Sequence, residues 1–239
     1  MEIQGSIAIV TGANRGLGRR FAQQLLERGA AKVYAGSRRI ESVDLPGVEP
    51  VQLDITDPAS VAAAATTASD ATILINNAGI ATFANLVEGD EDAIRREMET
   101  NFFGTLNMVR AFAPVLGANG GGAVLNILSV LSWRSFGLGN AYAAAKAASW
   151  SLTNSARLEL AQQGTQVVGL HVGGIDTDML AGFEAEKSDP ADIARAGLDG
   201  IAAGALEVLA DQNAVELKAI LSADPGTVYP ELAGSGPAH

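Results

Sequence analysis

Short runs of apolar, often β-branched residues recur along the chain, and most of each run is apolar rather than alternating with polar residues. Such runs are typical of strands covered on both faces, as in a parallel sheet between two layers of helices. Six stretches fit this description: Ile7–Val10, Lys32–Ala35, Val51–Leu53, Ile73–Ile75, Ala123–Leu128 and Gln166–Val172. We therefore predict a sheet of about six strands.

Longer stretches with helical periodicity separate the predicted strands. They cover residues Leu17–Arg28, Pro58–Ala68, Glu91–Leu116 and Tyr142–Gln163. Asp57 suits the N-cap of the second of these helices, with Pro58 at its first position. The alternation of strand and helix predicts an α/β fold with a doubly wound parallel sheet flanked by helices.

The C-terminal third breaks this alternation. Residues 190–221 have the pattern of one or two helices, and no convincing strand follows residue 172. We expect a single domain over residues 1–233, with a substrate loop at about 173–190 and a flexible tail over 234–239.

Composition excludes several classes of function. The 239 residues carry a net charge of −11, which opposes a nucleic-acid partner because a phosphate-binding face needs a surplus of Lys and Arg. The chain has no cysteine, so disulfides and thiolate metal sites are impossible, and we predict no metal site. Since no apolar run approaches the roughly 20 residues of a membrane span, we expect a soluble, cytoplasmic protein.

A glycine-rich stretch, Thr11–Gly18 (TGANRGLG), lies between the first predicted strand and the first helix. Backbone N–H groups at a helix N-terminus, unobstructed at glycines, form a site for a pyrophosphate, although a plain tight turn would have the same composition. The second predicted strand is followed by Ser37, Arg38 and Arg39, where NAD sites carry an acidic residue for the ribose. Guanidinium groups bind a 2′-phosphate, so these residues and Arg15 favour NADP over NAD.

A second cluster of small polar residues follows the fourth predicted strand. Asn76, Asn77, Ala78 and Gly79 come at the strand's carboxyl end, the edge of the sheet where open α/β proteins bind ligands. An asparagine-rich turn without a ligand is an equally good interpretation of this stretch alone.

Tyr142 and Lys146 are four residues apart on a predicted helix and therefore lie on one face. An ammonium near a phenol stabilises the phenolate and lowers its pKa, which allows acid–base catalysis at neutral pH. A solvated Tyr–Lys pair is the ordinary alternative. Ser129, just after the fifth strand, strengthens the catalytic interpretation, with Ser132 and Ser135 as rivals on the same loop.

The motifs TGANRGLG, NNAG and YAAAK, together with Asn101 and Ser129, resemble those of the short-chain dehydrogenase/reductase family, over about residues 3–180. The resemblance implies a Rossmann-like fold and a catalytic tetrad of Asn101, Ser129, Tyr142 and Lys146. The family's spacing from the serine to the tyrosine favours Ser129 over Ser132. Tyr142 would exchange a proton with the substrate oxygen, Ser129 would hold that oxygen, and Lys146 would bind the nicotinamide ribose and lower the Tyr142 pKa. Asn101 would anchor a water of a proton relay.

By the same resemblance, the cofactor residues extend well beyond the glycine loop. Asp54 and Ile55 would contact the adenine, Asn77 the adenosine-side ribose, and Ile175 and Thr177 the carboxamide and phosphates. The full predicted cofactor set is Gly12, Asn14, Arg15, Gly16, Leu17, Gly18, Ser37, Arg38, Asp54, Ile55, Asn77, Ala78, Gly79, Tyr142, Lys146, Ile175 and Thr177. Val172 stands where the family usually has proline. The backbone expected beside the nicotinamide therefore lacks the fixed φ angle that proline would give it.

The residues expected around the nicotinamide mouth are mostly apolar: Ile80, Phe83, Leu131, Trp133, Phe136, Leu138, Met179, Leu180 and Phe183, with Arg134 as the one evident cation. We therefore expect an NADP(H)-dependent oxidoreductase that reduces a small-molecule hydrophobic ketone or aldehyde, or oxidises the corresponding alcohol. The alternatives are a reductase of 3-oxoacyl groups on an acidic carrier protein and a non-catalytic dinucleotide-binding sensor or scaffold. Without a seventh strand, a homodimer through the two long helices is favoured over a tetramer.

Overall fold

The computed structural model describes residues 1–232, and these form one α/β unit around a single parallel sheet. The seven strands follow the order β3-β2-β1-β4-β5-β6-β7, and every adjacent pair is parallel. Their bounds are β1 (Ile7–Thr11), β2 (Lys32–Ser37), β3 (Glu49–Gln52), β4 (Ile73–Asn76), β5 (Ala123–Ile127), β6 (Gln166–His171) and β7 (Glu207–Leu209). The predicted α/β class and its first six strands are confirmed, with ends shifted by one or two residues. The predicted tail, 234–239, lies outside the described residues.

The sequence-based prediction that no strand follows residue 172 is wrong. β7 has only three residues, lies at the edge of the sheet, and pairs with β6 alone, with Glu207 opposite Gly169. None of its three residues is fully buried. A strand this short and half-exposed leaves no continuous apolar run, and for that reason the hydrophobic pattern did not indicate it.

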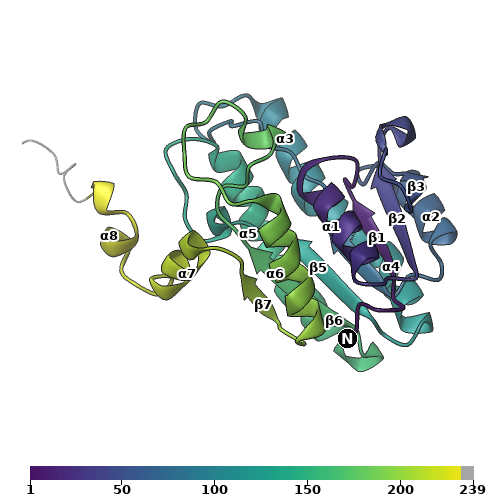
Figure 1. Cartoon of the computed structure of the whole chain (residues 1–239). Helices are drawn as coiled ribbons and strands as arrows, with labels where there is room; N and C mark the ends of the chain where they lie inside the picture. The colour runs from purple at the N-terminus through teal and green to yellow at the C-terminus, as the bar shows by residue number, and fades with distance from the viewer. Residues whose placement is uncertain (233–239) are drawn as a thin grey trace, which may run out of the picture.

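Helices cover both faces of the sheet, and their apolar faces explain the layering. In Figure 1, α1 and α6 lie in front of the sheet, where Phe21 and Leu25 of α1 pack with Leu198 of α6. On the opposite face, α2, α4 and α5 cover the sheet, with Met108 and Phe112 of α4 fully buried. The helices are α1 (Gly16–Glu27), α2 (Pro58–Thr67), α3 (Glu91–Met98), α4 (Thr105–Ala118), α5 (Asn140–Glu159), α6 (Pro190–Ala202), α7 (Gln212–Ala219) and α8 (Pro225–Val228).

The long helix predicted over Glu91–Leu116 is interrupted. A π-helical segment, Glu99–Gly104, separates α3 from α4. Within it, the Asn101 carbonyl oxygen accepts hydrogen bonds from the hydroxyls of Thr105, at 2.8 Å, and Ser149, at 2.9 Å. π-Bulges often mark functional sites. The buried residues of this one are Asn101 and Gly104 rather than large apolar side chains, so the hydropathy pattern does not indicate it.

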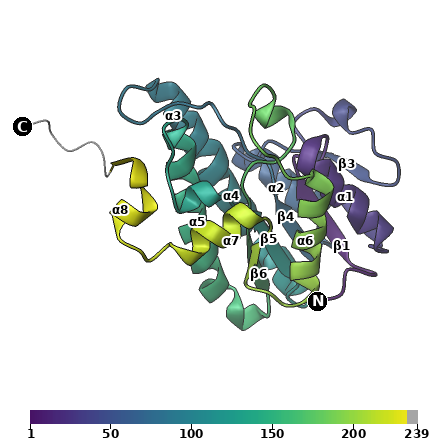
Figure 2. The same ribbon diagram turned by 60° about the vertical axis from the view of Figure 1, so that its left-hand side comes forward.

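The C-terminal segment after β7 extends away from the sheet. Figure 2 shows α7 beside α5 and, beyond it, α8 at the outer edge of the molecule. The segment returns to the body through Arg134, whose guanidinium donates to both carboxylate oxygens of Glu231 at 3.0 Å. Within residues 1–232, no helix combines the length and apolarity that a membrane crossing requires.

Candidate active site

A cavity of about 970 Å³ opens at the carboxyl ends of the strands. It runs from the loop after β1, past the ends of β4 and β5, to the loop after β6. In a doubly wound sheet, this edge, where the strand order reverses between β1 and β4, is the expected ligand site. Of the predicted catalytic and cofactor-binding residues, only Gly18 and Asn101 do not line the cavity.

The glycine loop is tied to the loop after β4 by Asn77 and Thr11. The Asn77 amide donates to the carbonyl oxygens of Thr11 and Gly12, at 2.9 and 3.3 Å, and the Thr11 hydroxyl accepts from the N–H groups of Asn77 and Ala78. Gly12 has a φ of +66°, a left-handed conformation that favours glycine. The two loops therefore form one rigid wall at the start of α1.

Gly18 supports this wall from behind, and we expect its replacement by alanine to destabilise the protein. A Cβ at this position would lie 2.5 Å from the Asn77 amide nitrogen and closer still to the Gly12 carbonyl oxygen. Overpacking of this kind costs about 1–3 kcal/mol. Gly18→Ala should therefore lower the melting temperature and weaken dinucleotide binding. Gly137→Ala, where a Cβ meets nothing within 4 Å, is the matched control. Equal melting temperatures for the two variants would contradict this account of the wall.

Arginines surround the end of the cavity near β2. Burial raises the pKa of Asp54, but hydrogen bonds from Thr56 and the charge of Arg38 outweigh it, so the pKa lies below its usual value. Arg15 forms an exposed ion pair with Asp178 at 2.6 Å. Exposed pairs contribute little, so Arg15 remains available to an anion.

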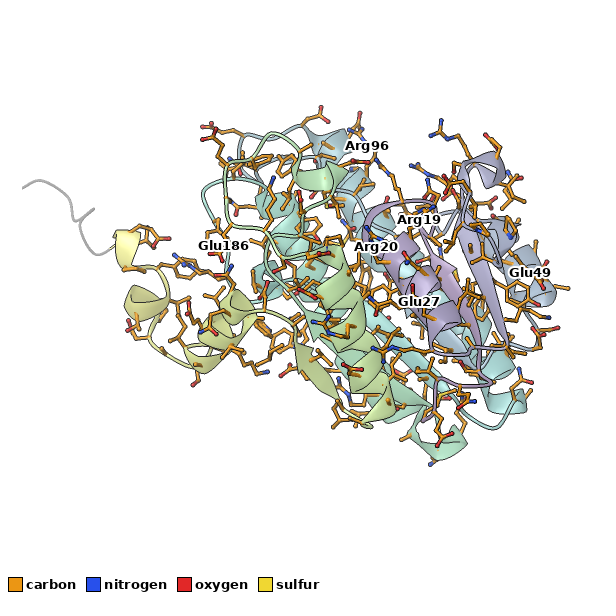
Figure 3. The ribbon with its side chains drawn as sticks, viewed as in Figure 1. Arg19, Arg20, Glu27, Glu49, Arg96 and Glu186 are labelled. Carbon is orange, nitrogen blue, oxygen red and sulfur yellow. The ribbon has the colours of Figure 1, made fainter. Side chains whose placement is uncertain are left out.

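Two further arginines line the cavity: Arg39, which the sequence analysis placed with Arg38 near the 2′-phosphate, and Arg96, which it did not anticipate. Arg39 follows Arg38, and Arg96 belongs to α3. Figure 3 shows Arg96 on the upper side of the molecule, where the loops that follow the strands gather. Among the described residues, neither forms an ion pair. Arg96 is 58 positions from Arg38 in the chain, and no local motif could have indicated that they share a cavity.

Ser129 is held by the turn that follows β5. Its backbone is extended, and its hydroxyl oxygen accepts a hydrogen bond from the Leu131 N–H at 3.1 Å. The hydroxyl proton is therefore free to donate into the cavity. The rivals are directed elsewhere: the buried Ser132 hydroxyl accepts from the Ser129 N–H at 3.4 Å, and neither Ser132 nor Ser135 lines the cavity. Of these three serines, Ser129 alone lines the cavity.

Tyr142 and Lys146 lie on one face of α5 and border the cavity beside Ser129. The Lys146 ammonium is buried, donates to the Ile127 carbonyl oxygen at 2.8 Å, and lies 5.5 Å from the centre of the Tyr142 ring. Burial lowers the pKa of Lys146 to about 8.

The expectation that Lys146 lowers the Tyr142 pKa is not met. Burial raises the pKa of the Tyr142 phenol, and the charge of Glu97 raises it further. Glu97 is a fully buried carboxylate on α3 that accepts from both the N–H and the hydroxyl of Thr82. The phenol therefore keeps its proton at neutral pH. Sequence patterns could not have indicated this effect on the pKa, since it arises from burial in the folded protein and from a charge on another helix.

Asn101 holds the loop after β4 from behind. Its side-chain oxygen accepts from the Ile80 N–H at 3.1 Å, and its amide donates to the Ile80 carbonyl oxygen at 2.9 Å. The side chain is buried, and the main-chain carbonyl faces α5 through Ser149. Asn101 thus fixes the segment Ile80–Phe83 beside Tyr142, by contacts that the sequence analysis did not anticipate.

Comparison with known proteins identifies the family. A family model described as short chain dehydrogenase matches residues 6–188, more than half of the chain. The chain belongs to the short-chain dehydrogenase/reductase family. The match contains the glycine loop, Asn77, Asn101, Ser129 and the Tyr142–Lys146 pair.

Solved structures and curated proteins agree with this assignment. A short-chain dehydrogenase from Burkholderia cenocepacia, solved in complex with NADP, superposes with a TM-score of 0.93 and is 42% identical, covering 99% of this chain and 100% of that one. The sorbitol dehydrogenase of Cereibacter sphaeroides is 33% identical over 79% of this chain and 78% of its own. The 3-oxoacyl-[acyl-carrier-protein] reductase of Vibrio harveyi is 31% identical over 96% and 94%. This chain is thus an oxidoreductase of that family.

The substrate end of this short-chain dehydrogenase is largely apolar. It is lined by Ile80, Phe83, Leu131, Phe136, Leu138, Met179 and Leu180, as predicted, and also by Asn213 and Leu217 of α7. Phe183 does not line the cavity but packs on Phe83, with ring centroids 4.8 Å apart.

Two residues predicted at the mouth of this short-chain dehydrogenase lie elsewhere. Trp133 turns back into the protein and stacks on His171, with ring centroids 3.9 Å apart. Arg134 lies over the rings of Phe136 and Tyr229 and binds Glu231, so it does not line the cavity. Both side chains lie where the C-terminal segment packs against this loop. Arg134 binds Glu231, and the Lys218 ammonium lies over the Trp133 ring.

Proposed function

We propose that this protein uses NADPH to reduce a hydrophobic ketone or aldehyde to the alcohol. The observation that carries the proposal is one continuous cavity. It joins the glycine loop and an arginine-rich end to Ser129, Tyr142 and Lys146, and it finishes in an apolar mouth. Oxidation of NADPH in the presence of a panel of ketones and aldehydes tests the proposal.

The residues that line the cavity fit a dinucleotide. The glycine loop would hold the pyrophosphate through its backbone N–H groups, because Gly12 and Gly16 line the cavity without side chains and have positive φ angles. Asp54 and Ile55 would contact the adenine, Asn77 and Lys146 the two riboses, and Ile175 and Thr177 the nicotinamide end. Bound there, the cofactor would supply the hydride.

Tyr142 supports the direction of reduction. Its phenol is protonated, since burial and the charge of Glu97 keep its pKa above the usual value. A protonated phenol beside the substrate can give its proton to the carbonyl oxygen as negative charge develops there. Ser129 would stabilise the same oxygen, because its hydroxyl proton is free to donate.

Lys146 and Asn101 would support this proton transfer. The Lys146 ammonium is anchored by the Ile127 carbonyl, which leaves two N–H groups for a ribose and for the replacement of the phenol proton. By the family resemblance, Asn101 would anchor a water of the relay to solvent, although its main-chain carbonyl accepts from Thr105 and Ser149 in this structure.

The preference for NADPH is supported by the arginines near β2 and by the NADP complex of the Burkholderia cenocepacia relative. Replacing either Arg15 or Arg38 by Glu should raise the KM for NADPH by roughly 10- to 100-fold, since one charge-assisted hydrogen bond contributes about 1.5–3 kcal/mol. The KM for NADH, which lacks the 2′-phosphate, should change little. Steady-state kinetics with both cofactors measures this difference.

Arg20→Glu is the control for this charge change. Arg20 donates to Gln23 on the exposed face of α1 and does not line the cavity, so both KM values should stay close to those of the wild type. Equal losses for NADPH and NADH in the Arg15 and Arg38 variants would refute the assignment of the 2′-phosphate site.

A second candidate is reduction of 3-oxoacyl groups on an acidic carrier protein. The similarity to the Vibrio harveyi reductase favours it. The net charge of −11 still opposes docking of an acidic protein. A carrier-bound 3-oxoacyl substrate that outperforms the free ketone would favour this candidate.

We also propose a homodimer through the helices on the α4 and α5 face. Leu158 of α5 is 80% exposed, and Phe103, which packs edge-on against Phe102, is 42% exposed. Large exposed apolar side chains on one layer support an interface there. Because β7 exists, its expected absence is no longer an argument against a tetramer.

A further inference from the structure

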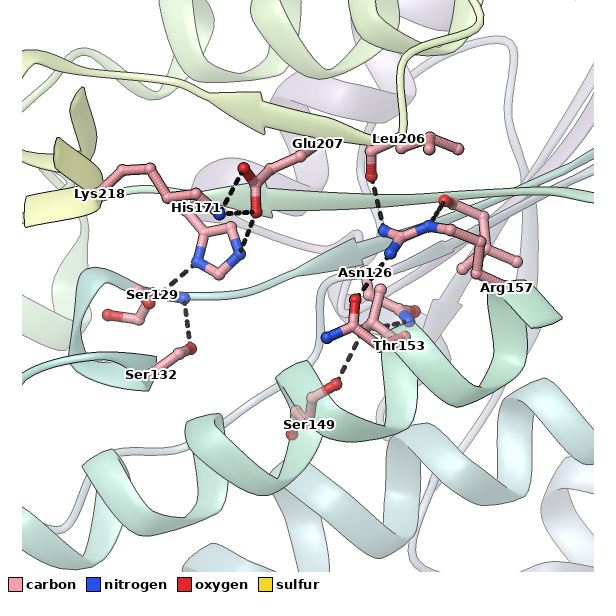
Figure 4. Close-up of polar contacts among 12 residues, drawn as sticks. Asn126, Ser129, Ser132, Ser149, Thr153, Arg157, His171, Leu206, Glu207 and Lys218 are labelled. Atoms are coloured by element: carbon pink, nitrogen blue, oxygen red, sulfur yellow. Dashed lines mark hydrogen bonds and ion pairs between the residues drawn. The ribbon is translucent and has the colours of Figure 1, made fainter. Parts of the chain in front are cut away.

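A buried polar cluster lies directly behind the catalytic turn, outside the cavity. Its centre is His171, the last residue of β6, whose side chain is almost completely buried. The ring nitrogen Nδ1 lies 3.3 Å from the Ser129 carbonyl oxygen. A carbonyl oxygen can only accept, so the contact requires a proton on Nδ1. Figure 4 shows the imidazole between Ser129 and Glu207.

This contact completes the frame around Ser129. The Ser129 carbonyl also accepts from the Ser132 N–H at 2.9 Å, while the N–H groups of Leu128 and Val130 donate to carbonyls of β6 and the loop after it. The Ser129 N–H donates to the Ser132 hydroxyl, and the other bonds are main-chain bonds. His171 thus provides the one side-chain donor to the Ser129 backbone among these contacts.

Charged groups from the C-terminal segment lie on the other side of the His171 ring. The Nε2 atom lies 3.6 Å from a carboxylate oxygen of Glu207 and has no hydrogen-bond partner in the described structure. Lys218 of α7 binds both oxygens of Glu207 at 2.8 Å, and its ammonium lies 5.2 Å from the centre of the Trp133 ring. Trp133 in turn stacks on the imidazole.

The imidazole is neutral at neutral pH. Burial lowers the pKa of His171 to about 4, against the opposing effects of the Ser129 carbonyl and Glu207, and the charges of Lys218 and Lys146 act in the same direction as burial. A neutral ring with its proton on Nδ1 matches the geometry toward Ser129. A ring with its proton on Nε2 would face the Ser129 carbonyl with a lone pair.

We propose that His171 is a positioning residue for Ser129. Its Nδ1–H fixes the Ser129 main chain, and the Trp133 ring, which stacks on the imidazole and lies under the Lys218 ammonium, holds the imidazole in place, so α7 helps to aim the serine hydroxyl. Only the expected effect of His171 on kcat rests on the proposed function. The hydrogen bond and the tautomer can be tested without any substrate.

The first test compares two replacements of His171. Asn places an amide donor near the position of Nδ1, whereas Leu has a similar volume and no donor. We expect His171→Leu to lower kcat by about 10- to 100-fold, since small displacements of catalytic groups have effects of this size. The KM for NADPH should stay within about twofold of the wild type because the cofactor contacts are untouched. His171→Asn should restore most of kcat, and an equal loss in both variants would overturn the proposal.

A double-mutant cycle separates positioning from general destabilisation. If His171 acts through Ser129, then His171→Leu should lower kcat much less when Ser129 is already Ala. A full additional loss in the Ser129→Ala background would show that His171 acts elsewhere. Wild-type enzyme that reduces no carbonyl compound would instead count against the proposed function and leave the hydrogen bond to be tested directly.

That direct test is the nitrogen-15 NMR spectrum of the wild-type imidazole. The chain has two histidines, so a His239→Gln variant leaves His171 as the sole signal. We expect Nδ1 to carry the proton and Nε2 to have the shift of an unprotonated ring nitrogen at pH 7. A proton on Nε2 alone, or on both nitrogens, would overturn the assignment.

Discussion

Replacing Tyr142 by Phe is expected to lower kcat for carbonyl reduction by about 10²- to 10⁴-fold, the usual contribution of a positioned general acid. The variant loses only the phenolic hydroxyl, whose proton is retained at neutral pH because burial and Glu97 raise the pKa. The affinity for NADPH should change little, because the remaining ring still borders the cavity. Steady-state kinetics together with a cofactor titration measures both effects.

Tyr34→Phe is the matched control. The Tyr34 hydroxyl binds Lys32 and Asp70 and does not line the cavity, so its loss should leave kcat close to that of the wild type. If Tyr142→Phe kept a near wild-type rate, the phenol would be unnecessary and the proposed mechanism would be wrong.

Lys146→Ala should impair both rate and cofactor affinity. The buried ammonium donates to the Ile127 carbonyl and remains free to donate to a ribose. A hydrogen bond to a charged group contributes about 1.5–3 kcal/mol, so the dissociation constant for NADPH should rise by roughly 10- to 100-fold. We expect kcat at saturating NADPH to fall by at least about 10²-fold, because proton delivery to Tyr142 is also lost.

The two effects of Lys146 can be measured separately. A fluorescence titration with NADPH reports the affinity, and turnover at saturating cofactor reports the rate. An unchanged dissociation constant would contradict the ribose contact, and an unchanged kcat would contradict the role in proton transfer. A melting temperature for each variant distinguishes these losses from unfolding.

The fold, and the meeting of Ser129 and Tyr142 in one cavity, were predictable for a physical reason. Strands covered on both faces are apolar throughout, so β1, β2, β4, β5 and β6 are visible in the sequence. The functional residues then follow strand ends, where parallel topology brings them together. Ser129 and Tyr142 are 13 positions apart in the chain and share one cavity for this reason.

Features that depend on packing from distant parts of the chain were not predictable. β7 is a three-residue edge strand, and the π-helical segment buries Asn101 and Gly104 rather than large apolar side chains, so the hydropathy pattern indicates neither. The raised pKa of Tyr142 depends on its burial and on Glu97 of another helix. Trp133 was expected at the mouth because the loop is apolar, yet its position is set by His171 and the C-terminal segment.

The central claim is that the protein transfers a hydride from NADPH to a carbonyl carbon. The most direct measurement uses NADPH deuterated at the transferable position of the nicotinamide, a panel of hydrophobic ketones and aldehydes, and mass spectrometry of the alcohol. We predict one deuterium on the carbinol carbon for each NADPH oxidised, and Tyr142→Phe should lower the rate of this transfer by about 10²- to 10⁴-fold without changing that ratio. Oxidation of NADPH without deuterium in the product, or no oxidation with any carbonyl compound, would contradict the account.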